Sequence, residues 1–172
     1  FAKSSGTTSN ESKFIPITYE ALEHTHFKGS KEPLTQFHSF YPNADIFVGK
    51  GVLIGGTHKM NEMNGKAYVG DLSAILMFHM PTWANHKSTP ELPIAIMDNW
   101  EDKVEKMARA TMQENVTSIS GAPTWAMVLL NRILEISGKS HIHEVWPNLQ
   151  LFIHGGMSFE PYRETYKRLI PG

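Results

Sequence analysis

The 172-residue sequence has no cysteine, so disulfide bonds and thiolate metal ligands are excluded. This absence fits a cytoplasmic protein, which is the location we expect, although some secreted bacterial proteins also lack cysteine. There is no surplus of charge either, because 16 Lys and Arg face 17 Asp and Glu and leave a formal net charge of −1. Without a basic surplus there is no general electrostatic attraction to nucleic acid or to an anionic membrane, and neither is expected as a partner.

Long apolar runs are also missing. The longest, such as residues 126–130, are far shorter than the roughly 20 residues that span a bilayer, and the start does not resemble a signal peptide. The sequence begins at Phe1 rather than at methionine, and a loop rich in Ser, Gly and Thr follows almost at once. Phosphate-binding loops usually follow a buried strand, so we expect residues 1–172 to be a single but incomplete domain of a longer protein. Nothing in the sequence indicates an oligomeric state.

The composition is that of a globular protein, with 41% hydrophobic and 19% charged residues. In the first half, a helix is predicted over about 19–28 with Gly29 as its stop, and buried strands are predicted within 45–54. Residues 57–66 are polar and rich in Met, Asn and Gly, which indicates an exposed loop. Three prolines exclude a regular helix interior over 81–93.

The second half alternates helices and strands. Apolar residues recur every three or four positions after Asp98, and Pro123 suits the first position of a helix that Gly138 ends. The predicted elements are a helix at about 99–114, a strand at 116–120, a helix from 123 to about 138, a strand at 149–154 and a helix at about 159–169. This order predicts an α/β layered fold in which helices flank a largely parallel sheet.

The loop between Lys3 and Lys13 is the stretch best suited to binding phosphate. Its hydroxyls and flexible backbone N–H groups are the donors that a triphosphate needs, its glycine permits close backbone approach, and Lys13 can reach back as a point charge. It is not a Walker A loop, and by composition alone it also fits an ordinary solvated loop. The candidate phosphate ligands are Ser4, Ser5, Gly6, Thr7, Thr8 and Lys13.

The order of these residues adds a resemblance to a known family. Ser-Ser-Gly-Thr-Thr, a spacer and then Lys-Phe-Ile-Pro resembles the phosphate loop of the adenylate-forming superfamily, whose pattern is Ser/Thr-Ser-Gly-Thr-Thr-Gly-x-Pro-Lys. Residues 9–12, the spacer, depart from that pattern. They resemble the corresponding spacer of the acyl-acid amido synthetases (the auxin-responsive Gretchen Hagen family) and of their bacterial relatives. Three further stretches, 98–103, 116–125 and 144–148, are similar to the core of this family, and 152–158 resembles its glycine turn. We therefore expect a bacterial-type member.

The resemblance implies an α/β N-terminal domain of an ATP-dependent ligase that forms an acyl-adenylate from a small carboxylic acid and passes the acyl group to an amino acid. ATP is the implied nucleotide, and Mg²⁺ is implied by the triphosphate without a ligand that can be named. An acyl-CoA ligase and a non-catalytic binding module stay open as alternatives. The family's Tyr-x-x-Ser-Glu motif and its small C-terminal domain are not in these 172 residues, so we expect them not to complete the reaction alone.

The resemblance also implies which residues would contact each substrate. Besides the phosphate loop, His154, Gly155, Gly156 and Met157 would border the adenine. Without the resemblance, the same glycines fit an ordinary strand-to-helix turn. Thr124 and Trp125, at a helix start, would line the acyl pocket, although a tryptophan there also suits the core.

The remaining chemical groups carry weaker signals. The pairs His24/His26 and His141/His143 lack a partner at metal-ligand spacing and are interpreted as surface histidines, so no metal site is predicted. No G-x-S-x-G nucleophile motif is present. Trp146 is expected to be a packing residue. The charged residues of the 99–114 helix are expected on its solvated face, and they are Lys103, Glu105, Lys106 and Arg109.

Overall fold

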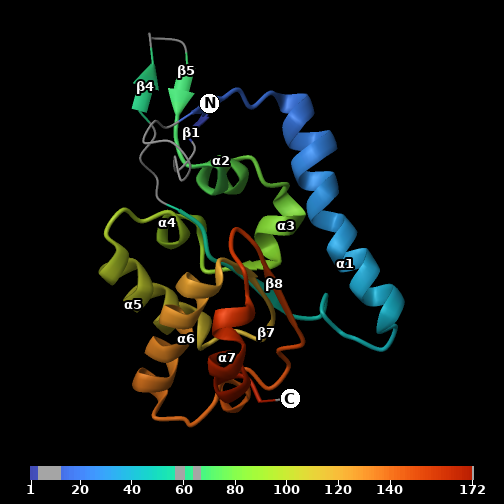
Figure 1. Cartoon of the computed structure of the whole chain (residues 1–172), viewed down its shortest axis with the longest axis vertical. Coiled ribbons are helices and arrows are strands. Elements are labelled where there is room, and N and C mark those ends of the chain that lie inside the picture. Colours follow the sequence, from blue (N-terminus) through green and yellow to red (C-terminus); the bar gives the residue numbers. More distant parts are fainter. Residues whose placement is uncertain (4–12, 57–60, 64–66, 172) are drawn as a thin grey trace. The chain divides into compact units, whose positions relative to one another are not determined.

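The computed structural model describes residues 1–3, 13–56, 61–63 and 67–171 (Figure 1). It contains two compact units, each with its own internal contacts. The first is made of Phe1–Pro42 and Gly55–Pro81, and the second of Asn43–Ile54 and Thr82–Gly172. Both units are therefore discontinuous or interrupted along the chain, and each is described by itself.

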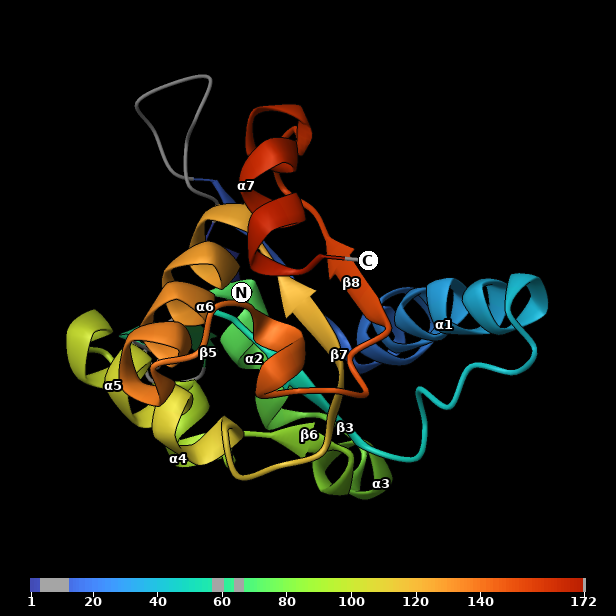
Figure 2. The same ribbon diagram turned by 90° about the horizontal axis from the view of Figure 1, so that it is seen from below.

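The second unit contains a four-stranded parallel sheet in the order β6-β3-β7-β8. Its strands are β3 (Lys50–Leu53), β6 (Ser88–Thr89), β7 (Val116–Gly121) and β8 (Leu151–His154). Figure 2 shows β3, β7 and β8 following one another across this sheet. The strands predicted at 116–120 and 149–154 are confirmed, as is the α/β class with a largely parallel sheet flanked by helices.

The helices of the second unit begin and end where local chemistry allows. They are α3 (Thr82–His86), α4 (Leu92–Ala95), α5 (Trp100–Thr111), α6 (Pro123–Ser137) and α7 (Arg163–Leu169), with short 3₁₀ turns η2 (Ile142–Glu144) and η3 (Glu160–Tyr162). The side chain of Asn99 accepts from the N–H of Asp102 at 3.0 Å and caps α5. Gly138 ends α6 at φ +68, a left-handed conformation that glycine adopts without strain.

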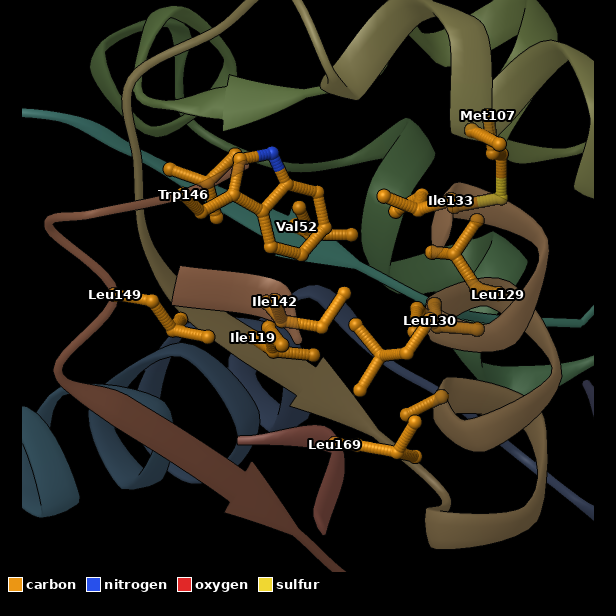
Figure 3. Packing of buried hydrophobic residues seen from close by; sticks show 14 of the residues in the cluster. Val52, Met107, Ile119, Leu129, Leu130, Ile133, Ile142, Trp146, Leu149 and Leu169 are labelled. Atoms are coloured by element: carbon orange, nitrogen blue, oxygen red, sulfur yellow. The ribbon is translucent and has the colours of Figure 1, made fainter. Parts of the chain in front are cut away.

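One hydrophobic core joins α4, α5, α6 and α7 to the sheet (Figure 3). Val52 of β3 and Ile119 of β7 lie in this core together with Leu129, Leu130 and Ile133 of α6. Trp146 is 1% exposed, and its indole N–H donates to the carbonyl of Thr111 at 3.0 Å. This confirms Trp146 as a packing residue, and the bond satisfies its one polar atom inside the core.

The charged face predicted for α5 is wrong at Lys103. This side chain is 0% exposed, whereas Lys106 and Arg109 are exposed and Glu105 bonds both Arg109 and Arg132. The physical reason is position, because residue 103 lies three after Trp100 and four before the buried Met107, on the apolar stripe of the helix. The Nζ of Lys103 lies 6.0 Å from the centroid of the Trp100 ring.

In its described residues, the first unit contains two antiparallel strand pairs and three helices. β1 (Ala2–Lys3) pairs with β2 (Phe14–Ile15), and β4 (Asn61–Met63) pairs with β5 (Ala67–Val69). The helices are the π-helix η1 (Ala21–Phe27), α1 (Lys28–Phe40) and α2 (Leu72–Phe78).

Three predictions in the first half need correction. Gly29 does not end the first helix, which continues as α1 to Phe40, because one glycine inside a helix costs only about 1 kcal/mol relative to alanine. Residues 45–49 are not a strand, since the N–H of Val48 donates to the carbonyl of Asp45 and closes a turn. In the predicted loop 57–66, residues 61–63 form β4, and the rest of that stretch lies outside the described residues.

Candidate functional site

The carboxyl edge of the parallel sheet is the place where the second unit offers backbone and side chains to a ligand. β3 lies in the middle, with β6 on one side and β7 and β8 on the other. From β3 the chain continues to β6 on one side and then returns to β7 and β8 on the other, so the strand order reverses between β3 and β7. In open α/β sheets, ligands bind outside the carboxyl ends of the strands at such a switch point.

Gly121 ends β7 at this switch point and packs directly against the end of β3. A Cβ at position 121 would lie 2.9 Å from the Cβ of Ile54 and 3.0 Å from its carbonyl oxygen. The N–H of Ile54 also donates to the carbonyl of Ser120 at 2.8 Å. The ends of the two strands are thus in close contact, and only glycine fits at 121 without displacing one of them.

The turn after β8 lies beside the end of β7, because Gly121 and His154 are register partners. His154, Gly155, Gly156 and Met157 are all exposed. Gly156 has φ +81, which favours glycine, and a Cβ added at Gly155 or at Gly156 would have no atom within 4 Å. The backbone of this turn is therefore open to a ligand that lies flat along it.

The residues that flank this turn belong to a cluster of packed aromatic rings. The His154 ring stacks on Phe159 with centroids 4.5 Å apart and planes at 22°. Phe152 stacks on Tyr166 at 5.1 Å and 22°. The Tyr166 hydroxyl donates to the carbonyl of Pro123 at 2.7 Å, and burial raises the pKa of Tyr166 above its ordinary value, so the hydroxyl stays protonated and acts as the donor.

The start of α6 is the second exposed feature at this edge. Ala122 is the N-cap residue, and no side chain in the described part of the chain caps the helix there. The backbone N–H groups of Thr124 and Trp125 therefore belong to an uncapped first turn. Trp125 is 39% exposed, so the interpretation of this residue as core is wrong. Its ring contacts Trp100 of α5 at a centroid distance of 5.6 Å, and its role in an acyl pocket stays a prediction.

The phosphate loop belongs to the first unit, and Ser4, Ser5, Gly6, Thr7 and Thr8 lie outside the described residues. Its two ends are described. Lys3 and Phe14 are register partners of β1 and β2, so the loop begins and ends at neighbouring points. Lys13 is exposed and directly precedes β2. The N–H of Lys3 donates to the carbonyl of Gly70 at 2.9 Å, which ties this end to the segment after β5.

Two of the histidines paired in the sequence, His141 and His143, lie at the η2 turn of the second unit, which precedes β8. The His141 and His143 rings are 6.4 Å apart, and His143 Nε2 lies 3.3 Å from the carbonyl oxygen of Leu149. Glu144 accepts from both the hydroxyl and the N–H of Ser140, and these bonds lower the pKa of Glu144 to about 2. Within the described ranges, no three His, Asp or Glu side chains are grouped so that they could hold a metal ion.

Sequence reasoning found both exposed segments of this edge but missed the groups that hold them. Tyr166, Phe159 and Phe152 were not singled out, because their contacts join residues that local periodicity does not relate. The alternation of Phe152 with His154 on one strand face is the one signal that could have been used.

Of the helices that the structure describes, none is long and apolar enough to cross a membrane.

Compared with known protein families, the chain matches the GH3 family N-terminal domain over residues 1–62 and 56–172, two stretches that overlap and together cover its whole length. No curated protein and no solved structure matches it.

Proposed function

Because the chain belongs to the GH3 family, we propose that the full-length protein is an ATP-dependent acyl-acid amido synthetase. It joins a carboxylic acid to the amino group of an amino acid. The observation that carries this proposal is the family match over the whole chain. The exposed glycine turn and the uncapped helix start, side by side at the carboxyl edge of a parallel sheet, support it.

The reaction has two steps in this proposal. A carboxylate oxygen of the acid attacks the α-phosphorus of ATP, a new P–O bond forms, and the bond to the β-phosphate breaks so that pyrophosphate leaves with the electron pair. The amine nitrogen then attacks the acyl carbonyl carbon, AMP leaves, and the nitrogen loses a proton. Both steps depend mainly on positioning and on stabilising charge on the phosphate oxygens.

In this proposal the substrates are contacted by three segments, which are the 4–8 loop with Lys13, the glycine turn after β8 and the start of α6. The hydroxyls and N–H groups of the 4–8 loop, with Lys13, hold the phosphates. The Gly155–Gly156 backbone lies along the flat face of the adenine, because no side chain stands in the way there. Met157 and His154 border the base, since a thioether and an imidazole both pack well on a planar ring. Thr124 and Trp125 line the acyl site.

The described residues do not supply a ligand set for magnesium, because they contain no group of three His, Asp or Glu placed to bind a metal. The ion is implied by the triphosphate, none of these 172 residues is named as its ligand, and no step is assigned to it.

The test uses the full-length protein and measures exchange of labelled pyrophosphate into ATP with a panel of small carboxylic acids. We expect exchange that depends on one class of acid, followed by amide products with amino acids. Exchange with thioester formation on adding coenzyme A instead would identify an acyl-CoA ligase. Absence of exchange with every acid would overturn the proposal in favour of a non-catalytic module.

The phosphate loop is tested in the same assay. Combining Ser5→Ala with Thr7→Ala is expected to remove most of the exchange rate, because two phosphate donors are lost. The matched control combines Ser9→Ala with Ser12→Ala, two hydroxyls of the spacer to which no role is given. Equal rates in the two double variants would remove the loop from the mechanism.

A further inference from the structure

Tyr166 of α7 contacts the first residue of α6 and the strand that precedes the glycine turn. It is 5% exposed. Its hydroxyl donates to the carbonyl of Pro123, the first residue of α6, at 2.7 Å. Its ring stacks on Phe152 of β8. A single side chain therefore links the start of one element to the strand that leads into the glycine turn.

The link to the turn is a continuous set of ring contacts, here called the aromatic ladder and made of Tyr166, Phe152, Phe159 and His154. Tyr166 lies 5.1 Å from Phe159 with planes at 48°, and Phe159 stacks on His154 at 4.5 Å. Phe152 also contacts His154, at 5.6 Å. His154 is the last residue of β8, so the ladder ends one peptide bond before Gly155.

The hydrogen bond from Tyr166 to Pro123 fixes the direction in which α6 begins. The carbonyl of the first residue of an α-helix normally accepts the N–H four residues later, and here the Tyr166 hydroxyl donates to that oxygen. Proline fixes its own φ, so holding the Pro123 carbonyl also fixes the direction in which α6 begins. Thr124 and Trp125 follow directly and move with it.

We propose that Tyr166 is a positioning residue, which holds the start of α6 and the Gly155–Gly156 turn in fixed relation. This inference rests on the proposed function, in which the first segment contacts the acid and the second contacts the adenine. Tyr166 would then align the carboxylate with the α-phosphate without touching either substrate. A displacement of about 1 Å between reacting groups is enough to lower a rate by about a hundredfold.

The alternative is that Tyr166 stabilises the fold and does nothing more. The two roles differ in what they change. A purely structural tyrosine affects how much protein is folded, whereas a positioning residue affects the rate of each folded molecule. Burial raises the pKa of Tyr166, so the hydroxyl donates at every pH at which the enzyme is assayed, and the effect of removing it should not vary with pH.

The experiment uses the full-length protein with Tyr166→Phe, Phe159→Leu and the control Tyr162→Phe. The control removes a hydroxyl from the half-buried tyrosine of η3, and the described part of the chain gives that hydroxyl no hydrogen bond. Tyr166→Phe keeps the ring and its stacking and removes the hydroxyl that bonds to Pro123. Phe159→Leu keeps an apolar side chain and breaks the ladder next to His154.

The first measurement is amide hydrogen exchange, which does not depend on activity. Tyr166→Phe should raise exchange about fivefold at Ala126 and Met127, in the first hydrogen-bonded turn of α6, and also at the paired amides of β8, the effect of losing one net hydrogen bond. Phe159→Leu should raise it at the paired amides of β8 alone, and Tyr162→Phe should leave both segments within about twofold of the wild type. Unchanged exchange in Tyr166→Phe would overturn the coupling.

The second measurement is pyrophosphate exchange, normalised to the number of active sites titrated by one round of adenylate formation. Tyr166→Phe should lower kcat per titrated site about tenfold and leave the KM for ATP and for the acid within about twofold. An unchanged kcat per titrated site would leave Tyr166 a structural residue and overturn the inference. If the wild type shows no exchange of pyrophosphate, the proposed function fails, while hydrogen exchange still decides whether Tyr166 couples the two segments.

Discussion

Alanine substitutions at Gly155 and at Gly156 distinguish the effect of backbone strain from the effect of an obstructed ligand. They are adjacent and exposed, and a Cβ at either position would meet no atom within 4 Å. They differ in one respect, because Gly156 has φ +81 and Gly155 is not among the glycines with positive φ. A methyl group therefore fits at both positions, and only the backbone of Gly156 opposes it.

The expected size of the difference follows from two contributions. Alanine in a left-handed conformation costs about 1–2 kcal/mol. Replacing glycine by alanine also restricts the unfolded chain, which stabilises a protein by about 0.4–1 kcal/mol where the native conformation allows it. The second contribution is common to both variants. The free energy of unfolding of Gly156→Ala should therefore be about 1–2 kcal/mol lower than that of Gly155→Ala, which should match or slightly exceed the wild type.

Urea unfolding of the chain, followed by tryptophan fluorescence, measures this difference. With a denaturant slope of about 1–3 kcal/mol per molar, the midpoints should differ by at least about 0.3 M. Equal midpoints for the two variants would refute the assignment of a left-handed turn at Gly156.

The same pair tests the proposed nucleotide contact in the full-length protein. If adenine lies along this backbone, both methyl groups obstruct it, and the KM for ATP should rise about fivefold or more in both variants. A rise in Gly156→Ala alone would be explained by strain. No rise in either would refute the adenine contact.

Three further changes test the packing and electrostatics. Gly121→Ala should lower the free energy of unfolding by about 1–3 kcal/mol, measured by urea, because the new Cβ would lie 2.9 Å from that of Ile54; an unchanged midpoint would contradict the close approach. Trp146→Phe should cost about 1–3 kcal/mol in thermal unfolding, through a lost indole hydrogen bond and a cavity. Glu144, whose pKa is lowered to about 2 mainly by the Ser140 hydroxyl, stabilises the folded state above its ordinary pKa of 4.5. The urea midpoint of the wild type should therefore fall toward that of Glu144→Gln as the pH drops from about 4.5 to 2, and a constant gap would contradict this.

The parts of the fold that could be predicted are those decided by neighbours in sequence. Pro123 and Gly138 bound α6 because proline suits the first helical position and glycine the left-handed end. The β-branched run 116–120 forms β7 for the same kind of reason. By contrast, Phe47 and Val48 look like strand residues, yet they are 54% and 68% exposed in a turn. The apolar character of these side chains therefore does not distinguish a buried strand from an exposed turn.

The candidate site could be predicted only where its residues are consecutive. The glycine turn and the start of α6 are visible as short motifs. The Tyr166 hydroxyl and the Pro123 carbonyl are 43 residues apart, and no local pattern relates them. Lys103 shows the opposite case, since its spacing from Trp100 and Met107 places it on the buried stripe, whereas its charge predicts the solvated face.

The interrupted second unit has a consequence for how the protein can be divided or synthesised. β3, the strand between β6 and β7, is encoded before Gly55–Pro81, while every other strand of the sheet comes after that segment. A gene fragment that starts at Thr82 would therefore produce β6 without its neighbour and leave β7 with a bare edge. On the ribosome, the emerging β3 must likewise wait for the whole intervening segment before its first partner exists. A single cut cannot separate the two units, and any dissection into independent pieces would first require the order of the segments to be rearranged.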